Sequence, residues 1–268
     1  MAWLGQPQSV FDQVQQIEGK IYKAKDNRKV LRFELDGRAL FLKLHRGVGW
    51  REIFKNLLQL KLPVTGAKNE WLAINYLQAC GVQTMTAVGY GSQGRNPADK
   101  LSFLVTEELT DTVTLEDHCR KWSSDAPSLP HRLKIIKQVA DIAQQMHSRG
   151  VNHRDFYLCH LLLSQPKPQK QESLPLKVFL VDLHRAQIRK AVPQRWRVKD
   201  IGSLYYSALE IGVTHRDFLR FMRFYSGQSL RQTLQKDLKF WKRVEQRAIQ
   251  LYIKANGIKP PQLKRVSA

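Results

Sequence analysis

A chain of 268 residues, 43% of them hydrophobic and 25% charged, can bury a large core and has the composition of an ordinary globular protein. Its 44 lysines and arginines exceed its 23 aspartates and glutamates, and the net charge of +21 favours anionic partners such as nucleic acid, acidic lipid or an acidic protein. The three cysteines match neither a disulfide framework nor a zinc site, and no run approaches ~18 apolar residues, so we expect a cytoplasmic chain that does not span a membrane.

The N-terminal part of the chain predicts a short helix within residues 1–18 and then antiparallel strands. Apolar and polar residues alternate with period 2 at 30–35 and again at 39–44, as half-buried strands require. Between them lies Asp36-Gly37, which is a strong signal for a two-residue hairpin turn. We therefore expect a β-hairpin here.

Two helices and two more strands are predicted next, at residues 53–60, 67–79, 86–90 and 102–106. Pro63 follows the first of these helices and ends it. On the second helix, Glu70 shares a face with Ile74 and Leu77, because residues three and four apart lie on one side of a helix. The order up to residue 110 is β-β-β-α-α-β-β.

Beyond residue 110 the pattern predicts a buried helix, a polar loop, an apolar strand and further helices, at 130–150, 164–175, 178–181 and 199–258. A small antiparallel β lobe with helices thus precedes a larger helical lobe. The expected fold class is α+β, with a β-rich lobe at 1–108 and a helical lobe at 109–268.

Four positions suit the chemistry of phosphoryl transfer from ATP. This reaction needs a cation on the phosphates, carboxylates for Mg²⁺ and a group that orients the acceptor hydroxyl. Lys43 lies on a predicted strand, Glu70 on the helix that can pair with it, Asp155 after a long buried helix, and Asp182 at the end of an apolar strand. Their order and element types indicate a two-lobed, protein-kinase-like fold.

The chain also resembles the lipopolysaccharide core heptose(I) kinase family, a branch of the protein-kinase-like superfamily. The resemblance rests on segments spread over most of the chain: FLKLHRG at 41–47, KNLL at 55–58, LPV at 62–64, VNHRD at 151–155, YLCH at 157–160, VDLHRAQ at 181–187, RWR at 195–197 and KD at 199–200. The resemblance implies ATP-dependent phosphorylation of the first heptose of the lipopolysaccharide inner core.

The same resemblance implies a role for each of the four positions. Lys43 would hold the ATP phosphates, Glu70 would pair with Lys43, Asp155 would act as the base, and Asp182 would bind Mg²⁺. His160 stands five residues past Asp155, where a protein kinase has a metal-binding asparagine. We place His160 at the metal, but imidazole suits Mg²⁺ poorly, so contact with phosphate or simple packing stays open.

The loop that covers the phosphates is atypical. Between Gly19 and Val30 the chain has no G-x-G-x-x-G motif but the basic segment 23–29. We expect its lysines and backbone amides to contact the phosphates, Lys25 among them.

A second His-Arg-Asp triplet, at 215–217, shows that the triplet alone is weak support for catalysis. Thr214 and Asp217 stand at the spacing of a helix capping box, followed by apolar residues at helical spacing, so we interpret this copy as a cap. A capping or buried structural role is also the rival interpretation of Asp155. For Lys43 and Glu70 the rival is ordinary solvated side chains.

Basic and aromatic residues near Asp182 offer sites for an acceptor. Arg185, Arg195, Arg197 and Lys199 could bind anionic core sugar or lipid phosphate, or form a solvated face. Three tryptophans, at 50, 71 and 196, could stack on sugar rings, although packing in a core is the commoner outcome.

The expected partners are a lipid-linked core acceptor and the anionic inner face of the inner membrane, where the protein would be peripheral. An acidic acyl carrier protein could use the same positive charge. Two alternatives remain: a kinase for another core sugar such as 3-deoxy-D-manno-octulosonic acid, and a non-catalytic basic module for membranes or nucleic acid. No nucleic-acid motif is present, so we expect no nucleic-acid partner.

Overall fold

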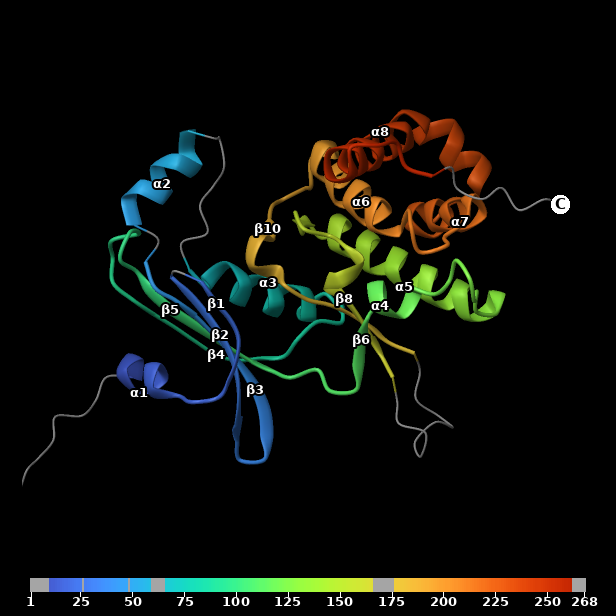
Figure 1. The fold of residues 1–268 in the computed structure, drawn as a ribbon. Helices are drawn as coiled ribbons and strands as arrows, with labels where there is room; N and C mark the ends of the chain where they lie inside the picture. Colours follow the sequence, from blue (N-terminus) through green and yellow to red (C-terminus); the bar gives the residue numbers. More distant parts are fainter. Residues whose placement is uncertain (1–9, 26, 48, 59–65, 166–175, 262–268) are drawn as a thin grey trace, which may run out of the picture. The chain divides into compact units, whose positions relative to one another are not determined.

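The computed structural model describes residues 10–25, 27–47, 49–58, 66–165 and 176–261. They form two compact units (Figure 1). The sheet unit contains the described residues up to Asn75 and from Met85 to Leu109, and the helical unit contains Tyr76–Thr84 and the described residues from Thr110 onward.

The sheet unit is built on five antiparallel strands in the order β1-β2-β3-β5-β4. Their bounds are Lys20–Lys25, Arg28–Leu35, Arg38–His45, Ala87–Gln93 and Leu101–Glu107 for β1 to β5. The expected hairpin joins β2 to β3, and Asp36 and Gly37 have φ values of 51° and 72°. Two successive positive φ angles are what a tight hairpin turn of this kind needs.

Three helices belong to this part of the chain: α1 (Val10–Gln16), α2 (Gly49–Leu58) and α3 (Lys68–Ala79). Helix α2 starts at Gly49, four residues before the predicted start, and the predicted stop at Pro63 lies outside the described residues. Helix α3 matches its prediction, and its Glu70, Ile74 and Leu77 are all buried.

The two faces of the sheet carry different chemistry. On one face Val14 of α1 packs into a core of strand residues that includes Leu42 and Leu44 of β3. Because side chains alternate along a strand, Lys43 points to the opposite face, where it meets α3. The alternation of β3 thus places a lysine on the side of the sheet away from α1.

Five helices form most of the helical unit: α4 (Leu115–Cys119), α5 (Leu129–Ser148), α6 (Gln194–Ala208), α7 (His215–Ser226) and α8 (Leu230–Asn256). Helix α5 packs on α7, and α6 packs on α8. Helix α8 contains one non-helical residue, Asp237, with φ −121°. Both the predicted 130–150 helix and the predicted helical C-terminal part are confirmed.

Short strands and 3₁₀ turns in this unit hold the loops between the helices. They form the sheets β6-β8-β9 and β10-β7. The elements are β6 (Thr112–Thr114), β7 (Val151–Asn152), η1 (Leu158–His160), β8 (Leu161–Ser164), β9 (Val178–Leu180), η3 (Leu183–Arg185) and β10 (Gln187–Ile188). Thr84 bridges to Leu180, with its hydroxyl donating to the Leu180 carbonyl at 2.6 Å, which ties segment 76–84 to this unit.

The α+β class expected from the sequence is confirmed, with an antiparallel sheet in the N-terminal part and helices toward the C-terminus. The described residues include no helix with the length and apolar character to cross a membrane.

Candidate active site

Lys43 and Glu70 form an ion pair in the sheet unit. Lys43 Nζ donates to Glu70 Oε1 at 2.5 Å, and their side chains are 19% and 1% exposed. The second oxygen of Glu70, Oε2, is buried without a hydrogen-bond partner among the described residues. Removing charges from water is costly, so a pair this deeply buried calls for a reason beyond stability. The structure brings together two residues that lie 27 positions apart in the sequence.

Asp155 lies in the loop that follows β7 of the helical unit. Its side chain is 17% exposed, and Arg185 Nη1 donates to Oδ1 at 2.6 Å. The other oxygen, Oδ2, makes no hydrogen bond to any described residue. Arg154, just before it, has φ 76°, a strained conformation for a residue with a side chain. Arg185 thus holds this carboxylate through one of its two oxygens.

A wholly buried aspartate on α6 fixes this loop. Asp200 Oδ2 accepts the backbone N–H of His153 at 2.7 Å, and Oδ1 accepts that of Arg154 at 2.8 Å. His147 Nε2 lies 3.2 Å from Oδ2. The carboxylate therefore stabilises the strained turn at Arg154. Sequence reasoning gave Asp200 no role of its own, although a charged residue beside the apolar Ile201 and Leu204 was a signal.

His153 supports the loop from inside. Its ring is buried; Nε2 donates to the Val181 carbonyl at 3.0 Å, and Nδ1 accepts the Asp155 N–H at 3.3 Å. This pattern requires the neutral ring with its proton on Nε2. Burial lowers the pKa of His153, which agrees with that state. His153 thus links the loop of Asp155 to the strand that precedes Asp182.

Asp182 lies two residues after β9, in the left-handed region with φ 62°. Its carboxylate contacts two imidazoles: His184 Nδ1 at 2.7 Å from Oδ1, and His160 Nε2 at 3.5 Å from Oδ2. His160 Nδ1 donates to the Asp155 carbonyl at 2.7 Å, so one histidine touches both aspartates. Asp155, Asp182 and His160 are brought together as expected.

The charge of His160 follows from its neighbours. Burial disfavours the protonated ring, but Cys159, the Asp155 carbonyl and Asp182 outweigh burial and raise the pKa of His160 to about 9. An imidazolium has no lone pair for a metal. Among the described residues no three His, Cys, Asp or Glu side chains are grouped to hold a metal ion. A Mg²⁺ ion bound through phosphates and water needs only one or two carboxylates, and the Asp182 oxygens suit it.

Lys25 and the three tryptophans are further predicted contact residues, and the tryptophans lie in different surroundings. The side chain of Lys25 lies outside the described part of the structure. Trp71 stacks on Tyr90, with ring centroids 5.8 Å apart, and the half-exposed Trp50 packs near Phe54. Trp196 lies among basic side chains, including Arg195 and Lys199.

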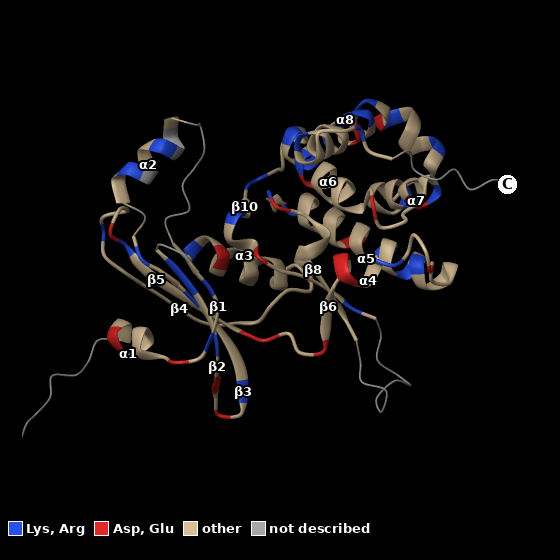
Figure 2. Cartoon of the chain, viewed as in Figure 1, with Lys and Arg blue, Asp and Glu red and all other residues tan. Residues whose placement is uncertain are grey.

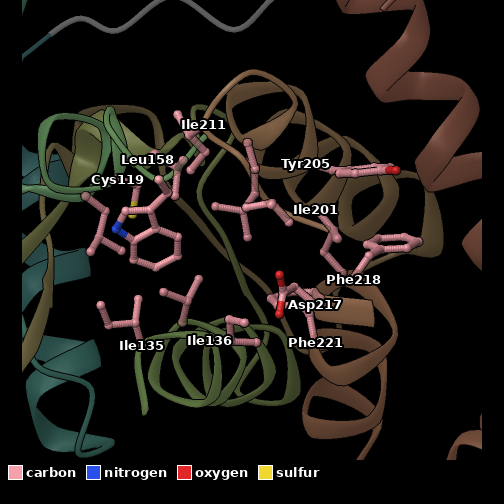
Figure 3. A pocket seen from close by; sticks show the side chains of 16 residues that line it. Cys119, Ile135, Ile136, Leu158, Ile201, Tyr205, Ile211, Asp217, Phe218 and Phe221 are labelled. Carbon is pink, nitrogen blue, oxygen red and sulfur yellow. The ribbon is translucent and has the colours of Figure 1, made fainter. Parts of the chain in front are cut away.

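An apolar cavity of about 80 Å³ lies within the helical unit (Figure 3). Aliphatic and aromatic side chains, most of them from α5, α6 and α7, line it together with the carboxylate of Asp217, and Leu158 of η1 contributes from the loop that follows Asp155. Burial raises the pKa of the Cys119 thiol there to about 12, so this cysteine is an apolar wall group. Apart from Asp217, the cavity is lined chiefly by apolar groups.

The lysine–glutamate pair of the sheet unit and the two loop aspartates of the helical unit are residue types that a protein-kinase-like phosphotransferase requires. Comparison with known proteins shows which family of kinases this is. The chain belongs to the lipopolysaccharide kinase (Kdo/WaaP) family, whose model matches residues 12–225.

The similar proteins cover nearly the whole chain. The lipopolysaccharide core heptose(I) kinase WaaP of Pseudomonas aeruginosa is 49% identical over 244 residues, 90% of each chain. WaaP of Escherichia coli is 44% identical over 234 residues, 87% of this chain and 88% of its own. A solved structure of WaaP in complex with acyl carrier protein has a TM-score of 0.76 and 41% identity, and covers 90% of this chain and 92% of its own. The protein-kinase-like fold and the kinase class inferred from the sequence are confirmed.

Proposed function

We propose that this chain transfers the γ-phosphate of ATP to a hydroxyl of the first heptose in the lipopolysaccharide inner core. The observation that carries the proposal is the geometry of Asp155. One carboxylate oxygen is held by Arg185, the loop is fixed by Asp200, and the other oxygen makes no hydrogen bond to the described residues. The identity of the acceptor is inferred from the relatives that are named as heptose(I) kinases.

The roles of the residues follow from this reaction. The oxygen of the heptose hydroxyl forms a bond to the γ-phosphorus while the bond from that phosphorus to the ADP oxygen breaks. Asp155 accepts the proton that the hydroxyl loses. Lys43, held by Glu70, supplies positive charge to the phosphates, and Lys25 adds to it from the phosphate-covering segment. Asp182 provides oxygens for Mg²⁺, which would neutralise charge on the β- and γ-phosphates. His160, as an imidazolium, suits a phosphate oxygen better than the metal.

Peripheral attachment to the cytoplasmic face of the inner membrane fits a lipid-linked acceptor and a net charge of +21. We also propose an acyl carrier protein as a partner, because a relative of the same fold was solved with one. Mass spectrometry of the protein purified from its host would detect a bound acyl carrier protein.

The test of the function is a transfer assay with product analysis. Purified chain, ATP and Mg²⁺ are incubated with core acceptors that carry or lack the first heptose, and the products are analysed by tandem mass spectrometry. We expect one phosphate on the heptose. Phosphate only on an acceptor without heptose would favour the rival assignment to another core sugar.

A further inference from the structure

A cluster of cations surrounds Trp196 in the helical unit. Four basic groups lie within reach of its ring: Arg154 at 5.5 Å, Arg189 at 5.9 Å, Arg195 at 5.7 Å and Lys199 at 4.3 Å from the ring centroid. The Nε1 of Trp196 and the Nε groups of Arg154 and Arg189 are buried without a hydrogen-bond partner among the described residues. Such donors are expensive to leave unpaired.

Arg195 and Lys199 also line a cavity of about 300 Å³ between α6 and α8. Arg243 and Arg247 of α8 complete its positive wall, with Gln246 and Gln250 as further donors, and none of the described residues that line it is acidic. Figure 2 shows lysines and arginines along α8 near α6. We call this the α6–α8 basic cavity.

The α6–α8 basic cavity is connected electrostatically to the catalytic loop. Burial lowers the pKa of Lys199, and Arg247, Arg154 and Arg195 lower it further. Burial and then Arg185 lower the pKa of Arg154. Basic side chains therefore continue from Arg185 to the cavity. Along this path Asp155 and Asp200 are the acidic groups that partly offset the lowering of the Arg154 pKa. Like charges that crowd together in this way are stabilised by a bound anion.

We propose that the α6–α8 basic cavity binds an anionic group of the acceptor, a carboxylate or a phosphate, at a distance from the hydroxyl that reacts. This inference rests on the proposed function for its acceptor. The pair proposed for the ATP phosphates, Lys43 and Glu70, belongs to the sheet unit, whereas every residue of the cavity belongs to the helical unit with Asp155. Arginine side chains recognise carboxylate and phosphate with paired N–H donors.

The experiment measures acceptor binding without turnover. A deacylated, heptose-containing core oligosaccharide is titrated into the full chain by calorimetry in the absence of nucleotide. Arg243→Gln combined with Arg247→Gln removes two charges from the cavity, and we expect roughly tenfold weaker binding or more. The matched control is Lys239→Gln with Lys242→Gln, which removes the same charge from exposed positions of α8 outside the cavity. We expect the control to bind within about twofold of the wild type.

Two treated acceptors identify the anion. One has its phosphates removed enzymatically, and the other has its carboxylates reduced. If one treatment abolishes the difference in acceptor affinity between the cavity variant and the wild type, the group that it removed is the one bound in the cavity. The proposal is overturned if the cavity variant binds the core acceptor as tightly as the control does, or if neither treatment reduces the difference in affinity between the variant and the wild type. It is also overturned if the variant loses affinity only for an acyl carrier protein. A wild type that binds the acceptor but never phosphorylates it would refute the proposed function instead.

Discussion

Arg185 Nη1 donates to Asp155 Oδ1 at 2.6 Å, which leaves Oδ2 as the oxygen that we propose for the substrate hydroxyl. Arg185 comes from η3, directly after Asp182, while Asp155 comes from the loop after β7. The proposed base and the proposed metal ligand are thus joined through neighbouring residues of one short segment. A shift of Asp182 or of Asp155 would therefore displace the other aspartate through Arg185.

Asp155→Asn keeps the shape of the side chain but removes its ability to accept a proton. We expect kcat to fall roughly 10²–10⁴-fold, the usual contribution of a positioned base. Binding of ATP, measured as ATP-dependent thermal stabilisation, should be preserved. A purified variant with near wild-type activity would refute the role of Asp155.

Asp217 of the second His-Arg-Asp triplet is the natural comparison. It caps α7 through Thr214 and pairs with Arg132 and Arg220, and its side chain is 1% exposed. Asp217→Ala should lower the free energy of unfolding by about 3–5 kcal/mol, because a buried arginine loses its partner. Chemical denaturation would measure this loss. Activity per folded molecule should stay close to wild type, the opposite of the Asp155 result.

The Lys43–Glu70 pair allows a test that separates stability from function. Lys43→Met leaves the carboxylate of Glu70 buried without its cation, and we expect a loss of about 3–5 kcal/mol in unfolding free energy. Adding Glu70→Gln should restore most of the stability, since the uncompensated charge is gone. Activity should stay abolished in the double variant. Stability that did not recover would show that Lys43 matters chiefly for packing.

Removal of Mg²⁺ should abolish much of the stabilisation that ATP gives. A ligand at a hundred times its Kd raises stability by about 2.7 kcal/mol. With wild type, EDTA should reduce the ATP-dependent shift in Tm. With Asp182→Asn, the shift should be small whether or not Mg²⁺ is present. A variant that still responds to Mg²⁺ like wild type would remove Asp182 from the metal site.

His160 should make stability depend on pH in the protein without nucleotide. Its pKa is about 9 in the folded chain and near 6.5 in the unfolded chain, so folding favours the protonated ring. The stabilisation is complete below about pH 6.5 and is lost as pH rises through about 9. We expect the difference in Tm between wild type and His160→Gln to shrink over this range. His215→Gln is the control for loss of an exposed imidazole, and a difference that does not change with pH would contradict the charge assigned to His160.

Local patterns made much of the fold predictable. Asp36-Gly37 between alternating segments defined the hairpin, and the spacing of Glu70, Ile74 and Leu77 defined the buried face of α3. The true start of α2 at Gly49 was missed, because Gly49 has a positive φ and its N–H donates to the Ala98 carbonyl, a contact distant in sequence.

Kinase chemistry requires particular residue types in order, so Lys43, Asp155 and Asp182 could be named from the sequence, and their roles stay predictions. Asp200 and the contact of Arg185 with Asp155 could not be predicted, since each depends on bonds between segments 30 or more residues apart. Nor did the sequence separate the two His-Arg-Asp triplets by their letters. Their different backbone settings do so: a loop anchored by Asp200, and the first turn of α7.

The crowding of cations around Trp196 bears on how this protein should be handled. Repulsion between Arg154, Arg195 and Lys199 is strongest at low ionic strength and is screened within about 10 Å at 0.1 M salt. Sulfate or phosphate buffers should therefore lengthen the storage life of the purified protein, whereas dilute buffers should promote its loss. Ion-exchange resins that carry dense negative charge should retain it strongly. A protein with this surface is best kept with an anion already in solution.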